Sequence, residues 1–414
     1  MEWGHLTPFP KPGRAVADCA RMITRAVLAL SLLLPAAAFA QTVDPLRNVS
    51  GTTANPGFNP WVTSGTGGWT FFHGFDAHVT YTSQTGPEEQ ENEIMSTNWF
   101  GVGAQRALGD RAFVLARGRV SLEQYTLPEE GYLQFFQYVT NEQGNPLHID
   151  RMRPHDLIGE AGVQVGWRPT NGSLLSVYGA LVGQPALGAA PAELRASGVD
   201  FAEAPFAYDI QETYADSTSV VTAGFSTRSF ALEASAFHDA FTTGEDAEID
   251  NGDIDSHSAR VTLMSNNFSL QVSRGDLGEE AAQRTITSGS LSYAAPMVAV
   301  TALWTRREHE NLRVAETAYG FELAFRGTRH TFMARAEHVD RPAGFPLIQL
   351  PVGVAVEPAT HYTGGYIFDF IAGGRYRAGA GVNIDYRTQT RHLEHIYGHK
   401  PQGIFVFLRA RTGA

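Results

Sequence analysis

Hydrophobic and polar residues alternate along most of this chain with a period of two. From Trp69 onward, segments of roughly 10 to 13 residues carry apolar side chains at every second position, which is typical of strands with different surroundings on their two faces. The clearest examples set Ala161, Val163, Val165 and Trp167 against Glu160, Gly162, Gln164 and Gly166, and Tyr376, Ala378, Ala380, Val382, Ile384 and Tyr386 against Arg375, Arg377, Asn383 and Asp385. One face is apolar, and the other is charged or small.

This pattern predicts an all-β protein of about sixteen strands, with 14 to 18 left open. After residue 40, no stretch approaches the roughly 20 apolar residues that a membrane-spanning helix needs, so any membrane insertion must use strands. The strands are expected at 68–81, 96–107, 111–122, 157–168, 172–183, 215–227, 229–238, 255–265, 267–275, 284–294, 297–306, 316–326, 329–339, 359–371, 374–386 and 402–411.

The connections between these strands alternate between tight and long. Tight turns include Leu108-Gly109-Asp110 and Gly327-Thr328, whereas long loops are expected at 82–95, 123–156, 184–214, 239–254, 340–358 and 387–401, with shorter ones at 276–283 and 307–315. Short turns at one end and long loops at the other are typical of an outer-membrane barrel, in which closure also removes every unpaired strand edge from lipid. We therefore predict a transmembrane antiparallel up-and-down β-barrel over 68–414, with an interfacial aromatic girdle at Trp69, Tyr81, Trp99, Trp167, Trp304 and Tyr386.

The N-terminus carries the features of a secretory signal peptide. Arg21 and Arg25 precede the apolar run 26–34, and the small residues of Ala38-Phe39-Ala40 predict cleavage before Gln41. Residues 1–20 fit a signal peptide poorly, so we expect translation to begin at Met22. Residues 41–67, rich in Gly, Asn, Thr and Pro, are expected to form a periplasmic N-terminal extension that is too short to be a folded plug domain.

Composition excludes some classes of partner. Removing residues 1–40 subtracts four basic and two acidic residues from the 31 and 43 of the whole chain, which leaves 27 against 41, an acidic mature protein without cysteine. Phosphate binding needs clustered Lys and Arg, so no nucleic acid partner is expected. Many bacterial barrels end on an aromatic residue, but here residues 409–414 follow the predicted last strand; either this tail is tolerated or assembly uses Phe405 or Phe407.

One segment is distinctive enough to carry a resemblance. The stretch Asp150-Arg151-Met152-Arg153-Pro154-His155-Asp156-Leu157, preceded by Glu130-Gly131-Tyr132 and followed by residues 183–188, resembles a family of uncharacterised bacterial outer-membrane β-barrel proteins, and the resemblance spans most of 68–340. It implies the barrel fold and the outer-membrane location. It implies no activity, because none is established for that family.

The predicted inner face carries charges of both signs. Charged side chains cannot face lipid at the bilayer midplane without a penalty of roughly 2–4 kcal/mol for Arg or Lys, so they must face water or one another. Either these residues line an aqueous channel, or they form a salt-bridged, filled interior. The lumen candidates are Arg117, Arg119, Glu160, Glu233, Arg260, Arg274, Glu322, Arg326, Arg335, Glu337, Arg375, Arg377 and Asp385.

Two loops carry further candidate sites. Asp150, Arg151, His155 and Asp156 lie where the longest loop enters a strand, where they either bind an ion at the mouth or pin a loop folded into the barrel. His392, His395 and His399 are candidate metal ligands in the last external loop. Residues 191–197 are expected to form a short helix that folds inward as a constriction.

No pattern in the chain indicates an enzyme or a cofactor. Ser256 and His257 adjoin, but neighbours on a strand point to opposite faces, and no Gly-x-Ser-x-Gly elbow or phosphate loop is present. The sequence favours a passive porin-like channel for small hydrophilic solutes or ions, with lipid and the barrel-assembly machinery as its other partners. The alternative is a non-conducting surface barrel whose external loops bind metal or a partner. The sequence leaves the oligomeric state open.

Overall fold

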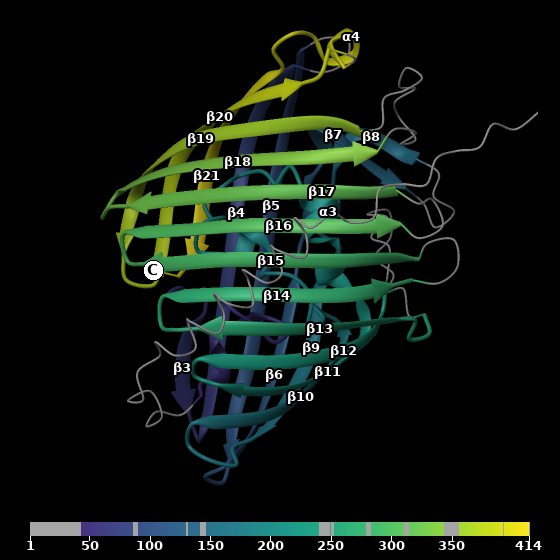
Figure 1. Ribbon diagram of the computed structural model, residues 1–414. Helices are drawn as coiled ribbons and strands as arrows, with labels where there is room; N and C mark the ends of the chain where they lie inside the picture. Colours follow the sequence, from purple (N-terminus) through teal and green to yellow (C-terminus); the bar gives the residue numbers. More distant parts are fainter. Residues whose placement is uncertain are drawn as a thin grey trace, which may run out of the picture.

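The described chain forms a closed antiparallel barrel of sixteen strands, as predicted (Figure 1). The structure is a computed structural model that describes residues 43–85, 90–129, 131–140, 146–239, 249, 252–278, 283–309, 314–342, 356–391 and 393–413. The predicted signal peptide lies outside these residues.

All sixteen predicted strands are present, most within a few residues of their expected ends. They are β4 Trp69–Thr85, β5 Gln90–Leu108, β6 Ala112–Val120, β9 Ile158–Trp167, β10 Ser173–Val182, β11 Thr218–Thr227, β12 Phe230–His238, β13 Ser256–Met264, β14 Phe268–Leu277, β15 Arg284–Ala295, β16 Val298–His309, β17 Val314–Arg326, β18 His330–Pro342, β19 Val356–Gly373, β20 Tyr376–Gln389 and β21 Gln402–Thr412.

The barrel closes where its last strand pairs with its first. Leu408 of β21 lies opposite Val79 of β4, and the pairing extends over 76–84 of β4. A short additional strand, β3 (Val62–Thr66), pairs with the first residues of β4. This closure leaves no long strand edge exposed to lipid.

The predicted alternation of connections is confirmed in part. The long loop predicted at 82–95 is wrong, because β4 extends to Thr85 and β5 begins at Gln90, which leaves only residues 86–89 between them. The tight turns, such as that between β5 and β6 or between β17 and β18, gather at the end of the barrel where the C-terminus lies (Figure 1). The long connections, including 121–157 and 183–217, leave the opposite end. In outer-membrane barrels, the end with short turns lies in the periplasm and the end with long loops faces outward.

The outer face of the barrel is apolar. Val163, Val165 and Trp167 of β9 are each about half exposed, whereas Gln164 between them is buried. Aromatic residues pair across strands near both ends, as Trp304 does with Tyr319 and Phe325 with Phe332. The alternation therefore gives a lipid-facing belt with aromatic rims.

The prediction that Trp99 belongs to this aromatic girdle is wrong. Trp99 is 2% exposed and faces the interior, where its ring lies 5.8 Å from that of Trp61 in an edge arrangement. Its register on β5 decides this, because Phe100 is the neighbour that points outward. An aromatic residue near a strand end thus belongs to the girdle only if its parity matches the outer face.

Short elements occupy the interior and the loop end. Those between residues 43 and 61 are η2 (Pro45–Arg47), β1 (Asn48–Ser50) and β2 (Thr53–Ala54), and those between 183 and 217 are η3 (Ala192–Leu194), α3 (Tyr208–Gln211) and η4 (Thr213–Asp216). The loops contain α2 (Glu123–Thr126), α4 (Glu394–Tyr397) and the hairpin of β7 (Tyr132–Thr140) with β8 (Pro146–Met152). Among the described residues, no helix is long and apolar enough to cross a membrane.

Candidate functional site

Most of the charged residues predicted to line the lumen face inward and are buried by segments inside the barrel. Arg260 and Glu322 are each only 1% exposed. An open aqueous lumen would leave such side chains accessible, so the described interior is packed. The inward-facing, buried residues are Arg117, Arg119, Glu160, Glu233, Arg260, Glu322, Arg326, Arg335, Glu337 and Asp385.

The three remaining lumen candidates are less buried. Arg375 is exposed in the tight turn between β19 and β20, where it donates a hydrogen bond to the carbonyl of Thr63 at 2.8 Å. Arg274 is exposed on the outer face of β14, since Ser273 takes the inward position. Arg377 points inward near the turn end and donates to Asp369 at 2.8 Å.

Residues 43–61, which we call the N-terminal segment, lie inside the barrel. The sequence placed residues 41–67 outside it, as a periplasmic extension. Arg117 donates to the carbonyls of Asn48 and Gly51, both at 2.7 Å, and the amide of Gly51 donates to Glu160 at 3.1 Å. Two wall residues thus hold the backbone of this segment.

A third wall residue extends this attachment. Arg260 of β13 donates to the hydroxyls of Thr53 at 2.5 Å and Thr52 at 3.0 Å, while Glu233 holds its Nε at 3.0 Å. The segment therefore meets the wall at charges that the sequence predicted to line the lumen. A short, polar stretch without periodicity forms a plug because partners distant in sequence hold it.

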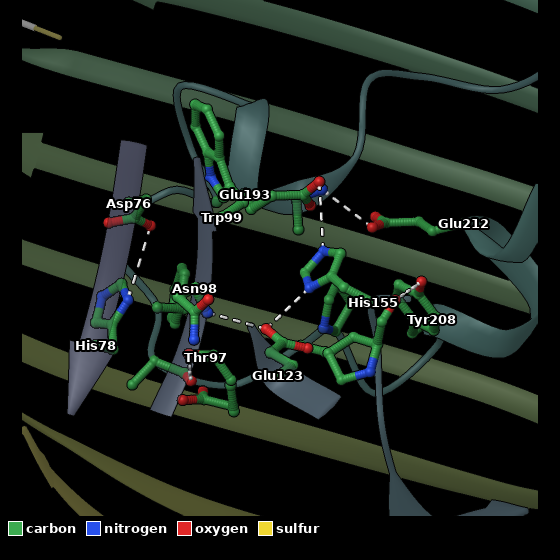
Figure 2. A pocket seen from close by; sticks show the side chains of 18 residues that line it. Asp76, His78, Thr97, Asn98, Trp99, Glu123, His155, Glu193, Tyr208 and Glu212 are labelled. Atoms are coloured by element: carbon green, nitrogen blue, oxygen red, sulfur yellow. Dashed lines mark hydrogen bonds and ion pairs between the residues drawn. The ribbon is translucent and has the colours of Figure 1, made fainter. Parts of the chain in front are cut away.

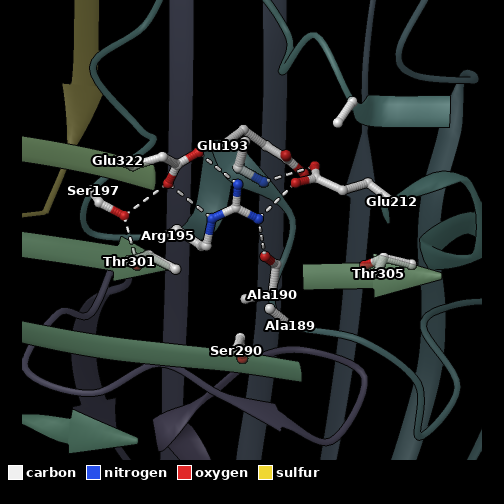
Figure 3. A network of polar contacts seen from close by, with 12 residues as sticks. Ala189, Ala190, Glu193, Arg195, Ser197, Glu212, Ser290, Thr301, Thr305 and Glu322 are labelled. Atoms are coloured by element: carbon white, nitrogen blue, oxygen red, sulfur yellow. Dashed lines mark hydrogen bonds and ion pairs between the residues drawn. The ribbon is translucent and has the colours of Figure 1, made fainter. Parts of the chain in front are cut away.

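Residues 183–217, which we call the inner loop, occupy a further part of the lumen. Arg195 anchors the loop to the wall by donating to Glu322 at 2.7 and 3.1 Å, and it donates within the loop to Glu212 at 2.6 Å (Figure 3). Ser197 also donates to Glu322, at 2.8 Å. The predicted inward fold of 191–197 is confirmed, as a 3-10 turn at Ala192–Leu194.

The inner loop and the N-terminal segment also meet each other. The side-chain amide of Asn55 donates to the carbonyl of Leu194 at 2.7 Å. Val49 and Trp61 of the N-terminal segment belong to one buried apolar cluster with Leu194 of the inner loop and Phe113 of the wall. The two insertions therefore form one continuous filling.

A small polar cavity lies between the inner loop and strands β4 and β5 (Figure 2). Its volume of about 40 Å³ has room for about three waters. Asp76 Oδ1, His78 Nε2, Glu123 Oε2 and Glu203 Oε1 are buried there without a hydrogen-bond partner among the described residues. Burial and the nearby Asp385 raise the pKa of Glu203 in the inner loop to about 8.

His155 bridges two loops beside this cavity (Figure 2). Its Nδ1 lies 2.9 Å from Glu123, and its Nε2 lies 3.5 Å from Glu193. Burial opposes the charged form, but the two carboxylates raise the pKa of His155 well above its usual value. His155 is therefore an imidazolium, and it attaches the loop 121–157, the second long loop, to the inner loop.

Two of the neighbouring mouth candidates, Arg151 and Asp156, are partly buried. Arg151 forms an ion pair with Glu93 of β5. Asp156 is partly buried, which raises its pKa to about 6. The side chain of Asp150 lies outside the described residues. This arrangement supports the interpretation that 150–156 pins a loop.

The predicted metal ligands of the last loop are only partly described. His392 and the side chain of His395 lie outside the described residues, and His399 is 82% exposed beside Glu394, at 3.1 Å. Within the described part of the chain, no group of three or more His, Cys, Asp or Glu side chains is arranged to hold a metal ion. The histidine site stays a prediction.

Sequence reasoning missed the residues that occupy the lumen. Asp200 and Asp209 of the inner loop each meet two or more wall arginines. A signal was present, because residues 183–217 hold six acidic residues and one basic residue, Arg195. An acidic loop facing arginine-rich strands is the pattern that could have found them.

Comparisons with known proteins agree with this architecture. No protein-family model matches the chain, and no curated protein matches it. Among solved structures, it is similar to OmpF of Salmonella typhi in complex with daunomycin, with a TM-score of 0.53 and 9% identity over 84% of this chain and 100% of that one. It is also similar to an anion-selective porin from Comamonas acidovorans, with a TM-score of 0.51 and 12% identity over 84% and 100%. The chain therefore has the fold of the bacterial outer-membrane porins.

Proposed function

We propose that this protein is a porin-like outer-membrane channel for small hydrophilic solutes or ions, and that the described conformation is its closed state. The observation that carries the proposal is the division of the barrel into an apolar outer belt and a strongly charged inner face. A wall that faced only permanent packing would be more stable with apolar residues, because buried ion pairs often contribute less than well-packed hydrophobic side chains. Charged walls suit a lumen that water enters.

The way in which the lumen is filled supports a closed state that can open. Neither the N-terminal segment nor the inner loop contributes a strand to the barrel, and Val182 at the end of β10 pairs directly with Thr218 at the start of β11. The sixteen strands therefore close without the filling. Its attachments to the wall include many hydrogen bonds and ion pairs, which water can replace when the filling moves.

A second candidate function rests on the same packing. If the filling never moves, the protein is a non-conducting barrel that presents its external loops at the cell surface. The nearly complete burial of the wall charges favours this alternative. Conductance separates the two candidates.

The deciding experiment records single channels of the refolded mature protein, residues 41–414, in a planar bilayer. We expect brief openings from a mostly closed baseline. Arg260→Ala removes the contacts to Thr52 and Thr53 and should increase the open time about tenfold, if roughly 1.4 kcal/mol of attachment is lost. The matched control is Arg274→Ala, because that arginine lies on the outer face.

One outcome of this experiment would contradict the channel. A folded, inserted protein that stays silent at every voltage, together with an equally silent Arg260→Ala variant, would favour the non-conducting barrel. Heat-dependent migration on gels establishes folding in both cases.

A further inference from the structure

One carboxylate of the inner loop lies among three wall arginines. Asp200 accepts hydrogen bonds from Nε of Arg326 at 2.7 Å, from Nε of Arg411 at 3.1 Å, and from Arg409. The side chains of Asp200, Arg409 and Arg411 are all 0% exposed. Planar guanidinium groups suit the two oxygens of a carboxylate, so this is the geometry of a carboxylate-binding site.

The wall does not neutralise these arginines by itself. Asp369 of β19 accepts from Arg409 at 2.6 Å and from Arg377 at 2.8 Å, and Asp76 lies on the neighbouring strand opposite Arg411. Without Asp200, the four arginines Arg326, Arg377, Arg409 and Arg411 would thus face two wall carboxylates. The wall alone therefore leaves an excess of positive charge at this site, which Asp200 of the inner loop reduces.

A second carboxylate of the inner loop contacts two arginines that also share a wall carboxylate. Asp209 accepts from both terminal nitrogens of Arg341 at 2.9 Å, and Arg307 lies nearby. Here the wall provides its own partner, since Glu316 accepts from Arg307 at 2.6 Å and from Arg341 at 3.0 Å. At the Asp200 position, by contrast, Arg326 and Arg411 form no ion pair with a wall carboxylate among the described residues.

The arginine site lies toward the periplasmic mouth. Arg326 ends β17 at a tight turn, and Arg411 is close to the C-terminus of β21. The guanidinium of Arg411 lies 5.8 Å from the ring centre of Phe58 in the N-terminal segment. Displacement of that segment would therefore uncover the site on the periplasmic side.

We propose that Arg326, Arg409 and Arg411 form a binding site for the carboxylate group of a transported solute, and that Asp200 occupies this site as an internal substitute in the closed state. The inference deepens the proposed function, on which it rests, by naming carboxylate-bearing solutes as the class that the lumen takes. A solute carboxylate competes with Asp200 for the same guanidinium groups. Binding of the solute and release of the inner loop are then coupled.

The test uses the full mature chain with Asp200→Asn, which keeps the size of the side chain and removes its charge. Thermal unfolding is followed by circular dichroism in detergent, with succinate, inorganic phosphate or chloride added at equal ionic strength. We expect the variant to unfold at a lower temperature than the wild type and to recover with a saturable dependence on succinate. The wild type should respond much less, because Asp200 fills its site.

Two further variants identify the site. Asp209→Asn removes one carboxylate from the same loop, and its stability should not respond to succinate, because Glu316 still pairs with both arginines there. Adding Arg411→Gln to Asp200→Asn should abolish the succinate response. A structural ion pair alone predicts destabilisation of Asp200→Asn without any anion-specific recovery, and that result would overturn the proposal. Recovery by phosphate but not by succinate would overturn the assignment to carboxylates.

A bilayer measurement covers the case in which Asp200→Asn does not fold. Arg411→Gln alone should lower the anion-over-cation permeability ratio of wild-type openings at least about threefold, since it removes one fixed positive charge from the lumen. Unchanged selectivity would contradict the site. An absence of openings would instead contradict the channel itself, and the unfolding measurements would still decide whether the carboxylate site exists.

Discussion

A partly buried histidine holds two loops together. His155 lies between Glu123 of the second long loop and Glu193 of the inner loop, and it is charged because both partners are carboxylates. His155 and Arg119, in turn, lower the pKa of Glu193 to about 2, although burial opposes its ionisation. The contact therefore depends on a proton that an unfolded histidine would lose near pH 6.5.

The sign of the resulting pH dependence follows from the raised pKa of His155. Its contribution to stability is complete below about pH 6.5, declines as the pH rises further, and disappears once the pH passes the raised folded value. Unfolding temperatures measured from neutral to alkaline pH should show this decline. His155→Gln should flatten it, whereas the exposed His399→Gln should leave it unchanged. An identical decline in His155→Gln would assign it to other groups.

At the scale of elements, the N-terminal segment depends on one glycine. Gly51 has a φ of +50°, and a Cβ built on it would lie 2.3 Å from the carbonyl oxygen of Gln184 in the inner loop. Both the left-handed backbone and the close approach require glycine. The seating of the segment is therefore sensitive to a single methyl group.

Gly51→Ala should release the N-terminal segment from the lumen. Each ~1.4 kcal/mol of lost attachment raises the released population about tenfold. Trypsin cleavage after Arg47, followed by mass spectrometry on the folded barrel, measures that population. Gly109→Ala is the matched control, since Gly109 has a φ of +66° but no neighbouring atom within 4 Å. Equal cleavage in the two variants would show that the contact with Gln184 is unimportant.

The elements differ in how far their sequences predict them. The strands could be predicted because lipid on one side and a polar interior on the other impose a period of two, as in Val163 and Val165 against Gln164. The N-terminal segment could not, because its position depends on Arg117 and Arg260, which lie far from it in the sequence and meet it only through the tertiary fold. Charge on the wall was predictable, but the partner of each charge was not.

At the scale of the whole molecule, the apolar outer belt makes the stability of the barrel depend on the lipid around it. Val163→Arg would place a charge near the middle of β9 on the lipid face and should cost about 2–4 kcal/mol in a bilayer. The folded fraction in lipid vesicles, titrated with urea, measures this cost, and Val163→Leu is the conservative control. If the arginine variant were as stable as the leucine variant, this face would not contact lipid.

The position of Asp200 has a consequence for how the protein is made. Its partners Arg409 and Arg411 belong to β21, the last strand of the barrel, which forms the seam with β4. Sealing the barrel therefore buries two arginines, and Asp200, a counter-charge that both of them share, comes from a loop about two hundred residues earlier in the chain. A chain whose inner loop is misplaced would have to seal over incompletely paired charges, at considerable cost. Pairing of β21 with β4 is therefore most favourable when the inner loop already lies inside the barrel.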